Sequence, residues 1–142
     1  MISIVIASKN RFCFIQNLIQ DLYLQIIQDL EIIIVDQSDK PYKFTDLKRI
    51  IHILDDQRGP CHARNLGLEK CTGEIIVFLD DDIHIEPDFL ERLCVPIIKA
   101  ETKVVVGAMC DEEGHYRNQE NTAWRSNSRN WLLSLTTNPD FP

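Results

Sequence analysis

Short runs of aliphatic residues alternate along the chain with longer segments of helical period. This alternation is typical of parallel strands that are joined by crossover helices. Most of the runs are nearly continuous in isoleucine, valine and leucine, which indicates strands covered on both faces. We therefore predict an α/β fold with a doubly wound, mainly parallel sheet, whose first strand lies centrally. The predicted strands are Ile2–Ala7, Glu31–Val35, Ile50–Leu54, Glu74–Leu79 and Lys103–Met109.

The segments between these strands predict helices. In the first of them, apolar residues recur at steps of three and four, so one helical face should pack on the sheet. Pro60 suits the first turn of the second helix, and Gly73 suits its C-terminal cap. Pro96 lies inside the third helix and should kink or end it. The predicted helices are Ile15–Ile26, Cys61–Cys71 and a segment that opens at Pro87, with a short helix at Phe44–Arg49.

Composition narrows the class of protein. The chain has 142 residues, with 44% hydrophobic and 26% charged, which is typical of one soluble globular domain and not of a disordered chain. Lysine and arginine number 15 against 22 aspartates and glutamates, a net charge of −7. This balance disfavours nucleic acid as a general electrostatic partner and is compatible with a cation site.

The cysteines and the N-terminus bear on the cellular compartment. Five cysteines are scattered without a CxxC spacing, which favours neither a disulfide framework nor structural zinc. We interpret them as small buried hydrophobes in a reducing cytoplasm. The first apolar run lacks a basic leader and is too short for a signal peptide or a membrane span. We expect a cytoplasmic chain without a transmembrane segment, which leaves room for peripheral contact with a membrane.

The strongest chemical feature is a run of three carboxylates, Asp80, Asp81 and Asp82, where a buried strand emerges into a loop. Adjacent carboxylates repel one another, so three of them at the end of a strand are explicable if a hard divalent cation binds there. In open α/β sheets this end of the strand is also where ligands bind. From the carboxylates alone, a solvated acidic turn or capping of the helix near Pro87 is an equal alternative.

Four segments in series resemble, in order and spacing, the family 2 glycosyltransferases with the GT-A fold. The resemblance covers roughly residues 2–110. It implies a Rossmann-like sheet of GT-A type, incomplete at the C-terminus, with a nucleotide-sugar-binding domain at 1–110. Residues 111–142 would be a polar tail that starts a truncated acceptor-binding part. The segments are Ser3–Arg11, Ile32–Ser38, Ala63–Leu68 and Thr72–Asp82.

The resemblance also implies a donor site. The acidic triplet would be the Asp-X-Asp motif, with Asp80 near the ribose and Asp82 coordinating Mn²⁺ or Mg²⁺ on the diphosphate. Asp36 would hydrogen-bond the base, commonly uracil, which makes a UDP-sugar the expected donor. The residues expected to contact the donor nucleotide are Ala7, Ser8, Asn10, Arg11, Asp36, Arg64, Asp80 and Asp81.

Each of these residues also has a simpler interpretation. Gln37 and Ser38 stand where the family often has a second aspartate and a glycine, which leaves the identity of the base open. His52, inside a strand, is interpreted as a structural histidine. The simpler roles are a turn at Asp36, a solvated helix face at Arg64 and helix capping at Ser8, Asn10 and Arg11.

The resulting hypothesis is a glycosyltransferase that transfers a sugar with inversion to an unknown glycan or lipid-linked acceptor. Inverting transfer needs a general base, and we assign none, because Asp111, Glu112 and Glu113 are better interpreted as a solvated acidic loop. We therefore expect little or no transfer by this chain alone, and dependence on a partner chain or self-association. The alternative is a non-catalytic remnant that binds a nucleotide sugar or a nucleoside diphosphate.

Overall fold

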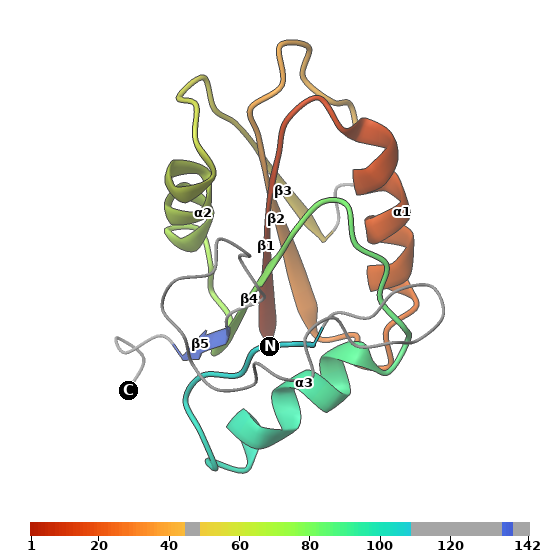
Figure 1. Cartoon of the computed structure of the whole chain (residues 1–142), viewed down its shortest axis with the longest axis vertical. Helices are drawn as coiled ribbons and strands as arrows, with labels where there is room; N and C mark the ends of the chain where they lie inside the picture. The colour runs from red at the N-terminus through yellow and green to blue at the C-terminus, as the bar shows by residue number, and fades with distance from the viewer. Residues whose placement is uncertain (45–48, 109–134, 138–142) are drawn as a thin grey trace.

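The computed structural model of the chain describes residues 1–44, 49–108 and 135–137. Strands and helices alternate through most of this part, as predicted (Figure 1). In chain order the elements are β1 (Ile2–Ser8), α1 (Phe12–Tyr23), β2 (Leu30–Asp36), β3 (Ile50–Leu54), α2 (Pro60–Leu68), β4 (Ile75–Leu79), α3 (Phe89–Ile98) and β5 (Leu135–Thr137).

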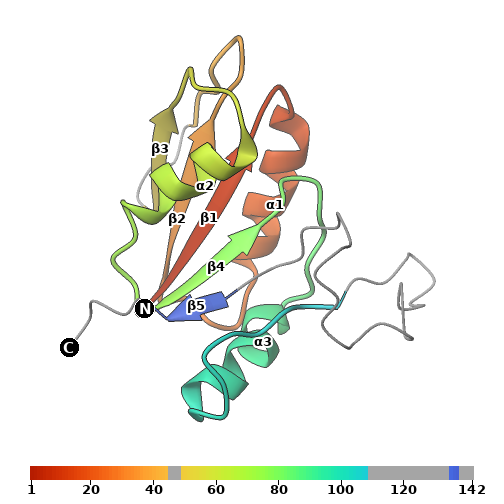
Figure 2. The same cartoon turned by 60° about the vertical axis from the view of Figure 1, so that its left-hand side comes forward.

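These strands form a sheet in the order β3-β2-β1-β4-β5 (Figure 2). β1 pairs in parallel with β2 and with β4, and β2 pairs in parallel with β3. β5 pairs antiparallel with β4. The α/β fold, the mainly parallel sheet and the central position of β1 are thereby confirmed. Because parallel strands end at one edge, the loops that follow β1, β2 and β4 meet there.

Side chains of the central strands alternate between two apolar layers. Ile4 and Ile6 of β1 face the layer that contains α1 and α3. Val5 faces the opposite layer, where it packs with Ala63 of α2. Figure 1 shows α1 and α2 on opposite sides of the sheet. The sheet is therefore doubly wound, and its strands are hydrophobic at successive positions because both faces are covered.

Gly73 was predicted to cap the C-terminus of α2, and this prediction is wrong. The helix ends at Leu68, with Glu69 as its cap in the right-handed helical conformation. Gly73 instead lies against β1, where a Cβ atom would sit 2.8 Å from both the Met1 carbonyl oxygen and the Ser3 nitrogen. A close approach between two backbone segments, and not a helix end, requires the glycine here.

The predicted strand at Lys103–Met109 is wrong within the described residues, which reach residue 108 in this segment. Thr102 Oγ1 lies 2.9 Å from the carbonyl oxygen of Val104 and 3.3 Å from its backbone nitrogen. This local pairing engages backbone groups that a strand ladder would use. Val104 and Val106 are also exposed, whereas Val105 packs against the core, so this valine run is covered on one face only. β5 pairs with β4 instead.

α1 has the predicted length but begins and ends three residues earlier than predicted, whereas α2 ends three residues before its predicted end. α1 ends at Tyr23, and Ile26 beyond it is exposed. α3 begins at Phe89, after Pro87, and contains Pro96, which was predicted to kink or end it; the helix continues for two residues beyond this proline. No helix among residues 1–44, 49–108 and 135–137 is long and apolar enough to span a membrane.

Two further predictions fall outside the described residues. The short helix at Phe44–Arg49 would include residues 45–48, which the structure does not describe. The domain boundary at residue 110 lies within residues 109–134, which are also outside the described residues. Burial of the cysteines is correct for Cys94 and wrong for Cys13 and Cys61, which are exposed because they lie on helix faces turned away from the sheet. Cys71 is half-buried.

Candidate functional site

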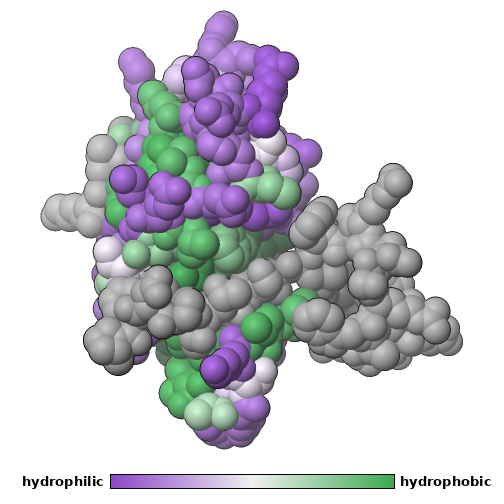
Figure 3. All heavy atoms as spheres, turned by 90° about the vertical axis from the view of Figure 1, so that its left-hand side faces the viewer, coloured by the Kyte–Doolittle hydropathy of each residue, from purple (hydrophilic) through white to green (hydrophobic). Residues whose placement is uncertain are grey.

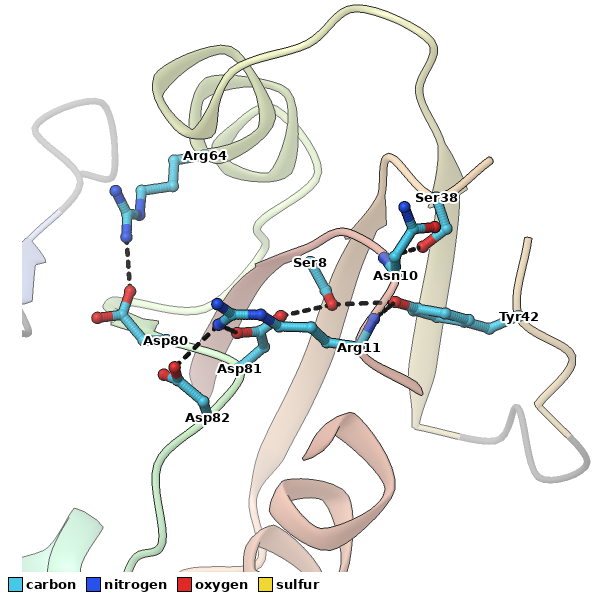
Figure 4. Close-up of polar contacts among 9 residues, drawn as sticks. All are labelled: Ser8, Asn10, Arg11, Ser38, Tyr42, Arg64, Asp80, Asp81 and Asp82. Carbon is cyan, nitrogen blue, oxygen red and sulfur yellow. Dashed lines mark hydrogen bonds and ion pairs between the residues drawn. The ribbon is translucent and has the colours of Figure 1, made fainter. Parts of the chain in front are cut away.

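The carboxyl edge of the sheet brings most of the predicted site residues together. The acidic triplet follows β4 directly, and β1 ends beside it in the sheet. Figure 4 shows Arg11 and Arg64 pointing toward the three carboxylates across this edge. Hydrophilic side chains also gather at this end of the molecule, above the face that α2 covers (Figure 3). The edge is the place where open α/β sheets bind their ligands.

Arg11 joins two of the three carboxylates. Its Nη1 atom lies 3.0 Å from Asp81 Oδ1 and 2.8 Å from Asp82 Oδ2. The hydrogen bond to Asp81, followed by the negative charges of both aspartates, raises the pKa of Arg11. Asp81 is buried, whereas the side chains of Arg11 and Asp82 are 50% and 47% exposed. Asp82 is therefore accessible to a ligand, whereas Asp81 lies buried beneath the surface and contacts the same arginine nitrogen.

A chain of hydrogen bonds holds Asp81 from its other side. Ser8 Oγ donates to Asp81 Oδ2 at 2.6 Å, and Tyr42 Oη lies 3.2 Å from Ser8 Oγ. The backbone N–H of Arg11 donates to Tyr42 Oη at 2.6 Å. Because a backbone N–H only donates and a carboxylate only accepts, the Tyr42 hydroxyl must donate to Ser8. The chain of bonds thus runs in one direction, toward the buried carboxylate.

Asp80 is paired separately. Arg64, on α2, places its Nη2 atom 2.7 Å from Asp80 Oδ1. The Arg64 side chain is 22% exposed and that of Asp80 is 45% exposed. The triplet therefore divides into a buried central carboxylate and two partly exposed ones, each held by an arginine from a different helix or loop.

Asp36 is completely buried at the end of β2. Its Oδ1 accepts the backbone N–H of Ser38 at 2.9 Å, and its Oδ2 accepts that of Tyr42 at 2.9 Å. His52 Nε2 lies 3.2 Å from the same Oδ2 atom, which gives this strand histidine a structural partner. Asp36 thus forms a turn and connects to the acidic triplet through Tyr42, without facing it directly.

Asn10 and Ala7 lie around this group. Asn10, with a φ of 57°, donates from Nδ2 to Asp39 Oδ2 at 3.0 Å and accepts the Asp39 backbone N–H at 3.1 Å. The hydrogen bond from Asn10 lowers the pKa of Asp39. Figure 4 places Asn10 beside Ser38, away from the triplet. Ala7 packs into the apolar layer on the α2 face.

The sequence analysis did not identify Tyr42. This residue is buried, and its ring packs against Phe12 at a centroid distance of 5.1 Å. Its hydroxyl and its backbone N–H both contact site residues, as described above. An aromatic residue within an otherwise polar loop was the available signal.

Gln37, which replaces the more common aspartate of the family, organises a second loop. Its Nε2 atom donates to Asp55 Oδ2 at 2.7 Å and to the carbonyl oxygen of Gly59 at 3.3 Å. Its Oε1 atom accepts the Gly59 backbone N–H at 3.3 Å. The hydrogen bond from Gln37 lowers the pKa of Asp55. Gln37 therefore fixes the segment that leads into α2 and so positions the helix that carries Arg64.

The donor set fits a hard divalent cation. Asp81 Oδ1 and Asp82 Oδ2 both lie within 3.0 Å of a single nitrogen atom of Arg11, so two carboxylate oxygens converge on one cation position. The described residues hold no cluster of three or more acidic, histidine or cysteine side chains arranged for a metal. Protein ligation by one or two carboxylates, with phosphate oxygens and water completing the shell, is how Mg²⁺ is usually bound.

Comparison with solved structures gives the class of protein. The S. aureus TarS fragment 1–349 superposes with a TM-score of 0.65 at 21% identity, over 80% of this chain and 37% of its own. A second structure of that fragment, in complex with UDP-GlcNAc, gives 0.59 at 21% identity over 72% of this chain and 32% of its own. The sheet and its helices thus have a fold of GT-A type. More specifically, the chain belongs to glycosyl transferase family 2, whose model matches residues 3–140.

Curated relatives agree with the family. An uncharacterised glycosyltransferase of Haemophilus influenzae is 30% identical over 125 residues, which are 81% of this chain and 50% of that protein. A GalNAc(5)-diNAcBac-PP-undecaprenol beta-1,3-glucosyltransferase of Campylobacter jejuni is 27% identical over 127 residues, 80% of this chain and 40% of that protein. The chain therefore spans half or less of the length of these two relatives.

Proposed function

We propose that this chain is the donor-binding part of a glycosyltransferase. It would bind a nucleotide sugar, most simply a UDP-sugar, together with Mn²⁺ or Mg²⁺, for inverting transfer to a glycan or lipid-linked acceptor. The observation that carries the proposal is the convergence of Asp81 and Asp82 on one cation position at the carboxyl edge of a family 2 fold. TarS, with the same fold, has been solved in complex with UDP-GlcNAc, which supports this choice of donor.

The residues at this edge have complementary roles. Asp82, whose carboxylate is partly exposed, would hold the cation, and Asp81 would hold it from a site fixed by Ser8. Asp80 would approach the ribose, with Arg64 beside it contacting the nucleotide. When bound, the divalent cation supplies Lewis-acid stabilisation of the charge that develops on the departing diphosphate.

The residues where β1 and β2 end side by side would shape the pocket for the base. On the β1 side these are Ala7, Ser8 and Asn10, at the end of the strand and in the loop that follows it. Asp36 would act mainly by holding the neighbouring loop, because both of its carboxylate oxygens already accept hydrogen bonds within the protein. Asp36 Oδ1 has room for a second hydrogen bond, but the side chain is completely buried, so a direct bond to the base would require the carboxylate to be uncovered.

Two further parts of the proposal rest on the family and on the sequence. Inversion would follow from displacement of the nucleotide by the acceptor hydroxyl in a single step, and we assign no general base among the described residues. A reducing cytoplasm is proposed from the odd number of cysteines.

Calorimetry tests donor binding. UDP should bind more tightly with Mn²⁺ than in the presence of a chelator, and Asp82→Asn should remove most of that difference because an anionic ligand is lost. A tenfold change in affinity corresponds to about 1.4 kcal/mol and is readily measured. Asp29→Asn is the matched control, since Asp29 is exposed and pairs with the Met1 amino group near the start of β2. Equal affinity of the folded wild type with and without Mn²⁺ would refute metal-dependent binding.

A transfer assay separates the enzyme from the binding remnant. The chain and a version extended by any downstream sequence are each incubated with UDP-sugars, Mn²⁺ and a panel of acceptors. Turnover by either one supports a glycosyltransferase. If both proteins bind UDP and neither transfers sugar, the non-catalytic alternative is favoured.

A further inference from the structure

We propose that Arg11 is an internal competitor for the cation position. In the free protein its guanidinium occupies the place between Asp81 and Asp82, and it transfers to the phosphates when the nucleotide binds. Metal and nucleotide would then bind cooperatively, because the nucleotide draws Arg11 away from the carboxylates and the metal keeps Arg11 free to bind the phosphates. This inference rests on the proposed function and concerns the same site.

The geometry makes the competition direct. The same two oxygen atoms, Asp81 Oδ1 and Asp82 Oδ2, that converge on Arg11 Nη1 are the ones available to a cation. A divalent ion of the size of Mg²⁺ sits about 2.0–2.1 Å from its oxygen ligands. It could not share this position with a guanidinium nitrogen that is 2.8 Å from Asp82. Like charges at such a separation also repel strongly.

The structure confines the movement to the Arg11 side chain. The Arg11 backbone N–H is bonded to Tyr42 Oη, and its carbonyl oxygen accepts from the backbone N–H groups of Phe14 and Ile15 at the start of α1. The Arg11 side chain, by contrast, is half exposed. Water screens the ion pair with Asp82 more than the pair with Asp81, because Asp82 is partly exposed and Asp81 is buried. Release of the guanidinium therefore needs no rearrangement of the fold.

The carboxylates remain in place when Arg11 leaves. Asp81 is buried and keeps the 2.6 Å hydrogen bond from Ser8 Oγ, which does not involve the guanidinium. Asp82 follows it in the chain. The cation position is thus held independently of the arginine that fills it.

A nucleoside diphosphate offers Arg11 a better partner. The planar guanidinium donates two parallel hydrogen bonds to phosphate oxygens, which a point charge such as lysine cannot do. A nucleotide that attracts Arg11 uncovers the carboxylates for the metal. Because coupling between two binding equilibria is reciprocal, bound metal should raise nucleotide affinity by the same factor.

The test is a variant with opposite effects on the two ligands. Arg11→Gln should tighten the binding of Mn²⁺ alone several-fold, measured by calorimetry or by loss of the free-ion paramagnetic resonance signal. The same variant should weaken UDP binding in saturating Mn²⁺ about tenfold. Arg11→Lys, which keeps the charge but loses the planar fork, should give intermediate values for both.

Lys9→Gln is the matched control, because it removes one positive charge from the adjacent position. Lys9 acts electrostatically on Asp39, and no contact joins it to the triplet. Equal tightening of Mn²⁺ binding by Lys9→Gln, or unchanged or weaker Mn²⁺ binding in folded Arg11→Gln, would overturn the competition. The titration with Mn²⁺ alone needs no nucleotide, so it decides this inference even where the wild type fails to bind UDP and the proposed function fails.

Discussion

Ser8 is the residue through which the end of β1 supports the acidic triplet. It is buried, donates to Asp81 and accepts from Tyr42. Removal of its hydroxyl would leave the Tyr42 donor and one oxygen of Asp81 without their partner. Buried polar groups that lose a partner cost about 1–3 kcal/mol, more for a charged group.

We therefore predict that Ser8→Ala lowers the free energy of unfolding by about 1–3 kcal/mol, measured by urea denaturation. Ser38→Ala is the control, because Ser38 Oγ accepts the Asn10 backbone N–H in an exposed contact where water can replace it. If Ser38→Ala lowered the free energy of unfolding as much as Ser8→Ala, burial of the Ser8 hydroxyl would not be the cause of the destabilisation.

A second prediction at this scale concerns the thiols. Burial raises the pKa of Cys94 to about 11, whereas Cys13 and Cys61 are exposed. Thiolate is the reactive form, so a disulfide reagent at pH 8 should modify Cys13 and Cys61 quickly and Cys94 only on unfolding. Mass spectrometry of peptides from a timed reaction would show the order. Modification of Cys94 at the rate of Cys13 in the folded protein would contradict it.

The positions of site residues were predictable where they follow directly from the end of a strand. Asp80 to Asp82 could be located because a buried aliphatic run stops at Leu79, which fixes their place at the sheet edge. Tyr42 could not be located, because its contacts depend on how a loop folds back across β1, and loops have no period. The exposure of Cys13 was missed because free cysteines are usually buried, and this general preference was applied to a residue outside the buried face of α1.

At the scale of elements, α2 packs on the sheet through its smallest side chains. Ala63 and Gly67 are buried against it, and a Cβ atom on Gly67 would lie 2.5 Å from Val5 Cγ1 and 3.3 Å from Val35 Cγ2. These valines are stiff and buried, so they cannot turn aside. The position of Arg64 above Asp80 therefore depends on this close approach.

Gly67→Ala should accordingly destabilise the protein, although alanine is the better helix former. Overpacking costs about 1–3 kcal/mol and the gain in helix propensity is about 1 kcal/mol, so the expected loss is up to about 2 kcal/mol. Asn65→Ala, at an exposed position of the same helix, should be neutral or slightly stabilising. Thermal unfolding of both variants measures the difference, and a gain in stability for Gly67→Ala would show that α2 packs less closely.

Strands were predictable where aliphatic residues follow one another almost without a break, even in β3, which is only partly buried. β3 was predicted at its observed bounds, and β1, β2 and β4 within one residue at each end, because their aliphatic runs are continuous. The same criterion failed at Lys103–Met109, where Val104 and Val106 are exposed and only Val105 packs against the core. β5 has three residues, too few to show any period.

At the scale of the whole molecule, ligand binding should couple to stability. A ligand present at 100 times its Kd stabilises the folded state by about 2.7 kcal/mol. For a domain of this size that shift amounts to a few degrees in Tm. We predict that UDP with Mn²⁺ raises Tm and that either alone has a smaller effect. Scanning fluorimetry on the wild type and Asp82→Asn measures the effect, and an equal shift in the variant would contradict it.

The order of strands in the sheet has a kinetic consequence. β1 joins β2 across 28 residues, as in the pairing of Ser3 with Glu31, but it joins β4 across about 73, the separation between Ser8 and Asp81. Closing the longer loop costs more chain entropy, so β4 should dock after the β1–α1–β2 unit has formed. The carboxylates of the site, Asp80–Asp82, directly follow β4 in the chain. The site is therefore completed only when β4, the last strand of the parallel core, has docked. Recovery of nucleotide binding during refolding would therefore report that final docking step and none of the earlier ones.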